Sequence, residues 1–175
     1  IIMSQINKNI YDNYKIYEID VEGNIIQIIN MTQKIIEQPR FDKLKKLHLL
    51  HNKHIKNINH LGNTLIELKC INCAVNQNGI NDLKVLQKLH CICQRNIYDL
   101  NHLANSLIEL NFSRQNYGMQ NYGIVLDQDG IKNLKVLRIL RVYDYRYIYD
   151  VNHLANTLIE LNCSGECGID QDGIK

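Results

Sequence analysis

Apolar residues follow a regular spacing over most of the 175-residue chain, in the pattern Leu-x-x-Leu-x-apolar. The pattern occurs six times, as Leu44/Leu47/Leu49, Leu65/Leu68/Cys70, Leu86/Leu89/Cys91, Leu107/Leu110/Phe112, Leu137/Leu140/Val142 and Leu158/Leu161/Cys163. The middle leucines are separated by 21, 21, 21, 30 and 21 residues, so one period with a single nine-residue insertion accounts for all six. The alternation around each middle leucine predicts a short strand with one buried face.

Two kinds of unit alternate along this period. The first kind contains the phrase Asn-His-Leu and covers residues 55–68, 97–111 and 148–162, of which the last two stretches are nearly identical. The second kind begins with Gly-Ile and covers residues 79–86 and 130–137. One such unit has too few apolar side chains to offset the entropy of ordering it, so we expect the units to stack and share a core.

The pattern and its period, which cover residues 41–175, resemble those of the leucine-rich-repeat family. The resemblance implies an α/β solenoid, an arc with a parallel concave sheet and short helical or 3-10 segments on the convex side. The phrases Asn-His-Leu and Asp-Gln-Asp-Gly-Ile-Lys further resemble those of leucine-rich-repeat proteins of giant DNA viruses. The chain departs from the family in the turn after each strand, where the usual asparagine is present at Asn52 and is replaced in the later units.

Residues 1–40 carry no clear copy of the pattern and are expected to form an N-terminal cap. Residues 16–21 alternate like a strand, and residues 25–29 are expected to return as the strand that starts the sheet, with Ile26 and Ile28 in the columns of Leu47 and Leu49. Residues 41–175 hold the repeats, with the insertion near 113–127. The last repeat is truncated after a copy of residues 127–132, so we expect that the natural chain continues or that this end packs against another chain.

The positions that alternate with the buried leucines predict a concave binding surface. Its candidate partner-binding residues are His48, Leu50, Lys69, Ile71, His90, Ile92, Arg141, Tyr143 and Tyr145. They combine a basic column with an aliphatic one and end in arginine and tyrosine, which are enriched at binding hot spots. One column earlier, Lys46, Glu67, Lys88 and Glu109 form a predicted ladder of alternating charge.

The insertion is a second candidate binding site. It contains Tyr117 and Tyr122 in a short duplication of the sequence Gln-Asn-Tyr-Gly. A long loop on a rigid scaffold is a favoured place for binding residues. A functionally neutral duplication explains the same sequence equally well.

The cysteines and histidines do not predict a metal centre. Cys70 and Cys91 occupy the column of Leu49, which favours buried apolar residues over a zinc site or a redox pair. The histidines of the Asn-His-Leu phrase lie two units apart, roughly 10 Å at ~4.8 Å per strand, too far to share one ion. The sequence Asp127-x-Asp129-Gly130 lacks the remaining ligands of a calcium loop. No cofactor is therefore predicted.

Composition narrows the class of protein. Hydrophobic residues make up 45% of the chain, charged residues 22%, and the net charge is +2, without the basic face that nucleic-acid binding requires. No apolar run approaches the ~18 residues of a membrane span. The first residues do not resemble a signal peptide, so we expect reduced cysteines and an intracellular location, the host cytoplasm if the protein is viral.

These observations favour a module that binds a protein partner on its concave face and that is not itself an enzyme. Two alternatives stay open. One is a structural component that self-associates through its C-terminal end. The other is the recognition part of a longer enzyme, such as a ubiquitin-ligase adaptor.

Overall fold

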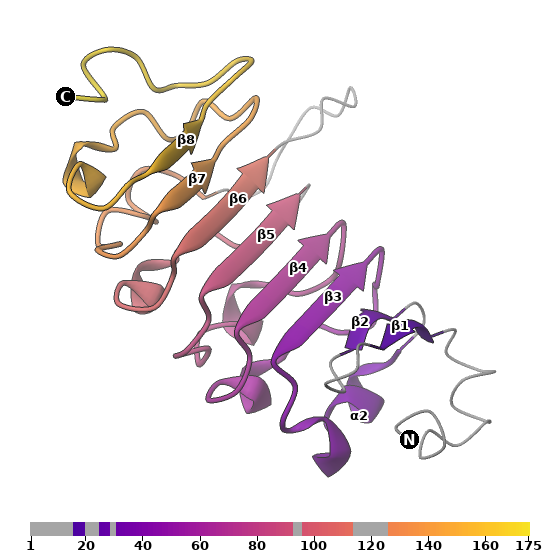
Figure 1. Ribbon diagram of the computed structural model, residues 1–175. Helices are drawn as coiled ribbons and strands as arrows, with labels where there is room; N and C mark the ends of the chain where they lie inside the picture. The colour runs from indigo at the N-terminus through magenta and orange to yellow at the C-terminus, as the bar shows by residue number, and fades with distance from the viewer. Residues whose placement is uncertain (1–15, 20–24, 29–30, 93–95, 114–125) are drawn as a thin grey trace.

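The computed structural model describes residues 16–19, 25–28, 31–92, 96–113 and 126–175. Eight strands lie side by side in one open sheet in the order of the sequence (Figure 1). They are β1 (Ile16–Ile19), β2 (Ile25–Ile28), β3 (Lys46–Leu50), β4 (Glu67–Ile71), β5 (Lys88–Ile92), β6 (Glu109–Ser113), β7 (Ile139–Arg141) and β8 (Glu160–Asn162). Each strand from β3 to β8 pairs in parallel with the next, and this open parallel sheet confirms the coarser part of the predicted fold.

The pairing register follows the spacing of the leucines. Leu47 lies opposite Leu68, Leu68 opposite Leu89, and Leu89 opposite Leu110. The nine-residue insertion does not shift this register, because Leu110 lies opposite Leu140. A shift of one residue would exchange the buried and exposed faces of a strand, so the buried leucines and the register determine one another.

The first two strands pair differently from the rest. β1 pairs with β2 in antiparallel fashion with two irregularities, and β2 pairs in parallel with β3. The register places Ile25 opposite Leu47, whereas the 21-residue spacing predicts Ile26 there, so this alignment is wrong by one residue. Helix α2 (Gln33–Ile36) and the 3-10 turn η1 (Pro39–Phe41) connect β2 to β3.

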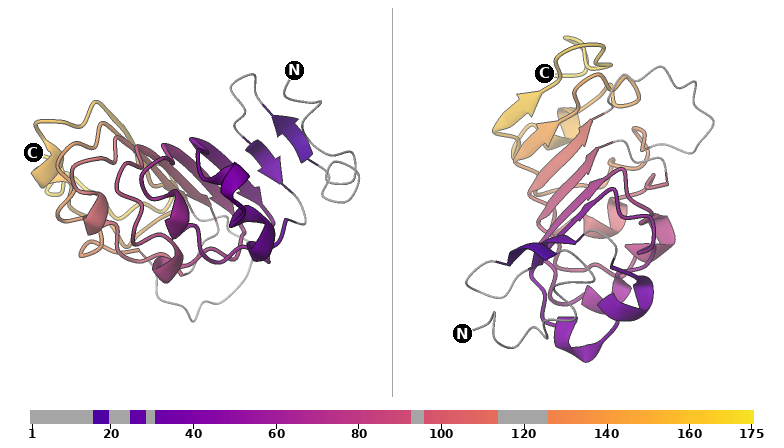
Figure 2. Two further views of the ribbon diagram at one scale, coloured as in Figure 1. Left: turned by 90° about the horizontal axis from the view of Figure 1, so that it is seen from below. Right: turned by 90° about the vertical axis from the view of Figure 1, so that its right-hand side faces the viewer.

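The remaining helical segments are single 3-10 turns gathered on one face of the sheet (Figure 2). They are η2 (Asn59–Leu61), η3 (Gln77–Gly79), η4 (Asn101–Leu103) and η5 (Asn152–Leu154). In η2, η4 and η5 the leucine of the Asn-His-Leu phrase is buried, while the asparagine and histidine lie at the surface. The opposite face of the sheet carries no helix among the described residues.

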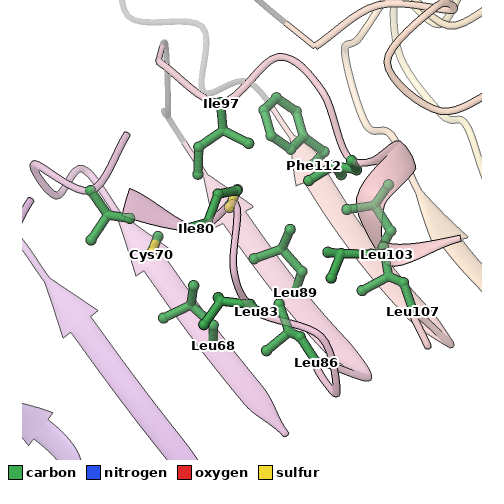
Figure 3. Packing of buried hydrophobic residues seen from close by; sticks show 14 of the residues in the cluster. Leu68, Cys70, Ile80, Leu83, Leu86, Leu89, Ile97, Leu103, Leu107 and Phe112 are labelled. Carbon is green, nitrogen blue, oxygen red and sulfur yellow. The ribbon is translucent and has the colours of Figure 1, made fainter. Parts of the chain in front are cut away.

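The core fills the space between the sheet and the 3-10 turns. Rows of side chains from successive units pack against one another, as Figure 3 shows for Leu68, Leu89 and Phe112 from the strands, Leu103 from η4 and Leu83 from the segment between η3 and β5. Cys70 and Cys91 are fully buried in this core, which confirms that they take the place of leucine. Every buried polar side-chain atom of the described residues has a hydrogen-bond partner.

Three glutamines link successive units in a way that the sequence did not predict. Gln77 accepts hydrogen bonds at its Oε1 from the backbone N–H groups of Tyr98 and Asp99, both at 3.0 Å, and its Nε2 donates to the Asp99 carbonyl. Gln33 and Gln128 make the same three contacts 23–24 and 21–22 residues further along the chain. We call Gln33, Gln77 and Gln128 the bridging glutamines.

The Asn-His-Leu phrase links units in both directions. The Asn101 side chain donates to the Asp129 carbonyl and accepts from the Asn133 N–H group, both in the following unit. The Nε2 of His102 donates to the Ile80 carbonyl of the preceding unit. The corresponding residues of the other two phrases make equivalent contacts, except that the Oδ1 of Asn152 accepts from the N–H group of Lys175, one residue earlier in the pattern; these contacts explain why asparagine and histidine recur together.

A residue in the left-handed region of φ follows the strands β3, β4, β7 and β8. His51, Asn72, Asp144 and Gly165 have φ values of 55°, 48°, 51° and 78°. Such a residue cannot continue an extended strand. It therefore turns the chain away from the sheet and ends the alternation of faces.

Replacing a bridging glutamine is expected to destabilise the fold. Gln77→Ala leaves the N–H groups of Tyr98 and Asp99 without their acceptor, at an expected cost of about 1–3 kcal/mol in the free energy of unfolding. Gln87→Ala, at an exposed position, is the matched control and is expected to change this free energy by less than about 0.5 kcal/mol. Urea unfolding measures both values, and equal costs would contradict a bridging role.

Candidate functional site

The candidate site is the face of the sheet opposite the 3-10 turns, which we call the open face. It carries the first, third and fifth residues of β3 to β6 and the first and third residues of β7 and β8. Buried and partly exposed positions alternate along β3, β4 and β6, as the sequence predicts. The candidates His48, Lys69, His90 and Arg141 lie in one column of this face, and Leu50, Ile71 and Ile92 in the next.

The charged column is organised around glutamates. Glu67 accepts a hydrogen bond from the Nε2 of His48 at 2.9 Å, and its Oε1 lies 3.2 Å from the ammonium of Lys69. His48 lies on the neighbouring strand, diagonally across from Glu67, and Lys69 lies two residues further along the same strand as Glu67. Side-chain exposures of 13% for His48 and 15% for Glu67 show that this contact is largely withdrawn from water.

Glu109 repeats this arrangement two strands further along. His90 donates to it from β5 at 3.0 Å, and Arg141 donates to it from β7 at 2.6 Å. Arg141 also donates to Glu160 of β8 at 2.8 Å, while Lys88 lies 3.8 Å from the other oxygen of Glu109. A chain of charge-assisted hydrogen bonds thus runs over β5, β6, β7 and β8.

These contacts shift the ionisation of the groups involved. Burial lowers the pKa of His48 despite the opposing hydrogen bond to Glu67, so His48 is neutral at pH 7 and carries its proton on Nε2. Burial alone raises the pKa of Glu67, but hydrogen bonds from His48 and Lys69 outweigh it and leave that pKa below its ordinary value. The pKa of Glu109 is lowered in the same way by Arg141 and His90.

The sequence predicted part of this network. The predicted ladder of alternating charge included Glu67 and Glu109, but it paired each glutamate with the lysine directly opposite on the neighbouring strand. The histidine partners lie 19 residues before each glutamate, which is one strand away and two positions further along it. The repeated spacing of His48 to Glu67 and His90 to Glu109 is the signal that identifies these pairs.

The neighbouring column is apolar and only half-buried. Leu50, Ile71 and Ile92 lie opposite one another on β3, β4 and β5, and Ser113 continues the column on β6. No helix among the described residues covers these side chains. They form a three-residue apolar strip, which we call the aliphatic strip.

The tyrosines beyond β7 divide between surface and core. Tyr143 is 48% exposed and remains a candidate binding residue. Tyr145 is only 4% exposed, so its predicted place on the binding surface is wrong. Its hydroxyl donates to the Leu126 carbonyl, and its ring packs edge-on against Phe112 with centroids 5.3 Å apart. Because β7 ends at Arg141 and Asp144 has a positive φ, the alternation of faces does not extend to Tyr145.

Other predicted features lie away from the open face. The loop candidates Tyr117 and Tyr122, and most of the insertion, fall outside the described residues. Within the described ranges no group of three or more histidine, cysteine, aspartate or glutamate side chains is placed to hold a metal ion. The five cysteines in these ranges are free thiols.

No family model, curated protein or solved structure matches this chain. No helix in the described part of the chain is both long and apolar enough to cross a membrane.

Two histidines with a lowered pKa predict that the fold loses stability in acid. His48 and His102 both have a pKa lowered by burial, so the unfolded chain binds protons more readily than the folded chain. Their contribution to stability is complete above the ordinary histidine pKa of 6.5 and is lost as the pH falls below it. The free energy of unfolding, measured in urea from pH 8 to pH 5, is expected to fall below pH 6.5.

His48→Gln is expected to make this pH dependence shallower, because glutamine can still donate to Glu67 but does not titrate. Gln87→Ala, at an exposed position that does not titrate, is the control and should leave the slope unchanged. A stability that rises on acidification through pH 6.5 would contradict the lowered pKa of these two histidines.

Proposed function

We propose that the protein is a leucine-rich-repeat solenoid that binds a protein partner on its open face, the concave side of the arc. The observation that carries the proposal is the aliphatic strip of Leu50, Ile71 and Ile92 beside a charged column whose members are already paired. The repeat is supported by the constant register of the leucines and by the recurring Asn, His and Gln links between units.

The paired charges favour binding for a physical reason. A side chain that is already held by hydrogen bonds loses little conformational freedom when a partner covers it. His48, Glu67 and Lys69 form such a held group beside Leu50 and Ile71. A partner can therefore cover the strip without leaving these charges unpaired.

The same arrangement defines the chemistry of the partner. The strip spans three strands, roughly 10 Å from Leu50 to Ile92 at ~4.8 Å per strand. A partner that fits it presents a short apolar ridge, with polar groups on the side that meets the charged column. Arg141 and Tyr143 extend the contact area toward β8 with the residue types enriched at hot spots.

The charged groups of this face support a binding role more than a catalytic one. His48 and His90 each donate to a glutamate, and each glutamate is shared with a lysine or an arginine. Among the described residues of this face, no serine or cysteine lies in hydrogen-bond contact with either histidine.

The proposal is tested by removing the aliphatic strip while keeping the sheet. The double variant Ile71→Thr, Ile92→Thr keeps the β-branched shape that strands favour but removes apolar surface. Affinity capture with the wild-type chain supplies the partner, and calorimetry measures its binding. A loss of about 1.4 kcal/mol or more, at least tenfold in Kd, is expected from the methyl and methylene groups removed.

The matched control is the double variant Lys84→Gln, Lys135→Gln, which changes exposed lysines before β5 and β7 and leaves the open face intact. Its affinity is expected to equal that of the wild type. Unchanged binding by the isoleucine variant, with both variants folded by circular dichroism, would exclude the open face as the binding surface.

A further inference from the structure

The outer face of β8 differs from the corresponding faces of the earlier units. Leu161 is partly exposed, whereas Leu47, Leu68, Leu89, Leu110 and Leu140 in the same column are fully buried. Ile159 is 76% exposed, whereas its counterparts Ile66 and Ile108 are half-buried. We call the outer edge of β8, together with residues 170–175, the end face; it lies at the yellow end of the molecule in Figure 1.

Residues 170–175 repeat part of the backbone contacts of residues 127–132. The Gly173 carbonyl accepts from the Val151 N–H group, as the Gly130 carbonyl accepts from Leu100. Asn152 donates to the Asp172 carbonyl, as Asn101 donates to the Asp129 carbonyl. The Oδ1 of Asn152 accepts from the N–H group of Lys175, one residue earlier in the pattern than Asn133, which donates to Asn101. The segment therefore shares with its copy at 127–132 the contacts of its Asp and Gly carbonyls to the preceding unit.

The side chain of Gln171, like that of Leu161, is more exposed than the equivalent side chains of earlier units. It occupies the place of the bridging glutamines Gln77 and Gln128, yet it is exposed and makes no hydrogen bond within the described ranges. The side chains of Gln77 and Gln128 each accept from two backbone N–H groups and donate to one carbonyl, all in the segment that follows the next strand. The end face therefore exposes an amide side chain whose counterparts each accept from two backbone N–H groups and donate to one carbonyl.

The backbone and charge of β8 continue the same pattern. Val142 and Asp144 donate their N–H groups to the carbonyls of Asn162 and Ser164 on the next strand. Cys163 and Gly165 hold the equivalent positions 21 residues later, and no further strand pairs with them among the described residues. Glu160 corresponds to Glu109, which accepts from Arg141 of the following strand.

We infer that the end face is a docking surface for a further unit of this chain's own pattern, with its strand parallel to β8. The docked strand places a leucine opposite Leu161 and, one residue after that leucine, an arginine or lysine against Glu160, as Leu140 and Arg141 are placed against Leu110 and Glu109. The turn after that strand supplies two N–H groups and a carbonyl to Gln171. The end face therefore continues the interface that joins every pair of units from β3 to β8.

A second copy of β8 arranged about a two-fold axis does not meet these requirements. Such a copy runs antiparallel to β8, so the turn that follows its strand lies at the opposite end of the edge. The groups that Gln171 needs would then be absent, because its counterparts bond to the turn that follows a parallel strand. The parallel unit satisfies the apolar, charged and amide groups of the end face together.

The inference is tested by extending the chain with its own sequence. A copy of residues 133–154 is fused after Lys175, since Lys175 corresponds to Lys132. The control carries the same extension with Leu137→Ser, Leu140→Ser and Val142→Ser in the copy. Hydrogen exchange of the Cys163 and Gly165 amides is measured together with the melting temperature.

The matched extension is expected to slow exchange at these two amides at least tenfold and to raise the melting temperature, whereas the control extension does neither. Gln171→Ala is expected to lower the melting temperature of the extended chain by about 2–4 °C and to leave that of the original chain unchanged. Equal exchange in the two extended chains, or an equal effect of Gln171→Ala in both lengths, overturns the inference. A dimer of the original chain that Leu161→Lys dissociates also overturns it, in favour of a second copy.

Discussion

The structure depends on one constraint, that the backbone and apolar groups of each unit are satisfied by the neighbouring units. A strand of three to five residues cannot pair with itself, and its leucines need a second layer of side chains to exclude water. Successive strands therefore pair leucine against leucine at a spacing of 21 residues. The insertion before β7 does not change this pairing, since Leu110 lies opposite Leu140.

The columns of side chains on the open face result from the same constraint. Because the buried positions fix the register, the intervening side chains are also brought into columns, and each column has the same neighbours from strand to strand. His48 and His90 consequently meet Glu67 and Glu109 in the same geometry, with distances of 2.9 and 3.0 Å. The aliphatic strip arises in the same way, since the fifth residues of β3, β4 and β5 are all aliphatic.

The sequence predicted those features that depend on periodicity alone. The short strands, the register from β3 to β8, the buried leucines and the burial of Cys70 and Cys91 follow from the spacing of apolar residues, whereas the parallel direction of the strands was implied by the resemblance to leucine-rich repeats. It could not predict features that depend on where a strand ends. Tyr145 appeared to continue the alternation of β7, but the positive φ of Asp144 turns its side chain into the core. The contacts of Gln77 and Gln128 were also missed, because a surface turn containing Asn, Asp and Gly has no apolar period that reveals a buried amide.

Two kinds of link between units alternate along the chain. Asn59, Asn101 and Asn152 join a unit with the Asn-His-Leu phrase to the Gly-Ile unit after it. Gln77 and Gln128 join each Gly-Ile unit to the Asn-His-Leu unit that follows. Removal of a single unit would bring together two ends that carry unmatched links, whereas removal of a pair would restore the alternation. The 21-residue period therefore determines the sheet, and the alternation of asparagine and glutamine determines the order in which units can be joined.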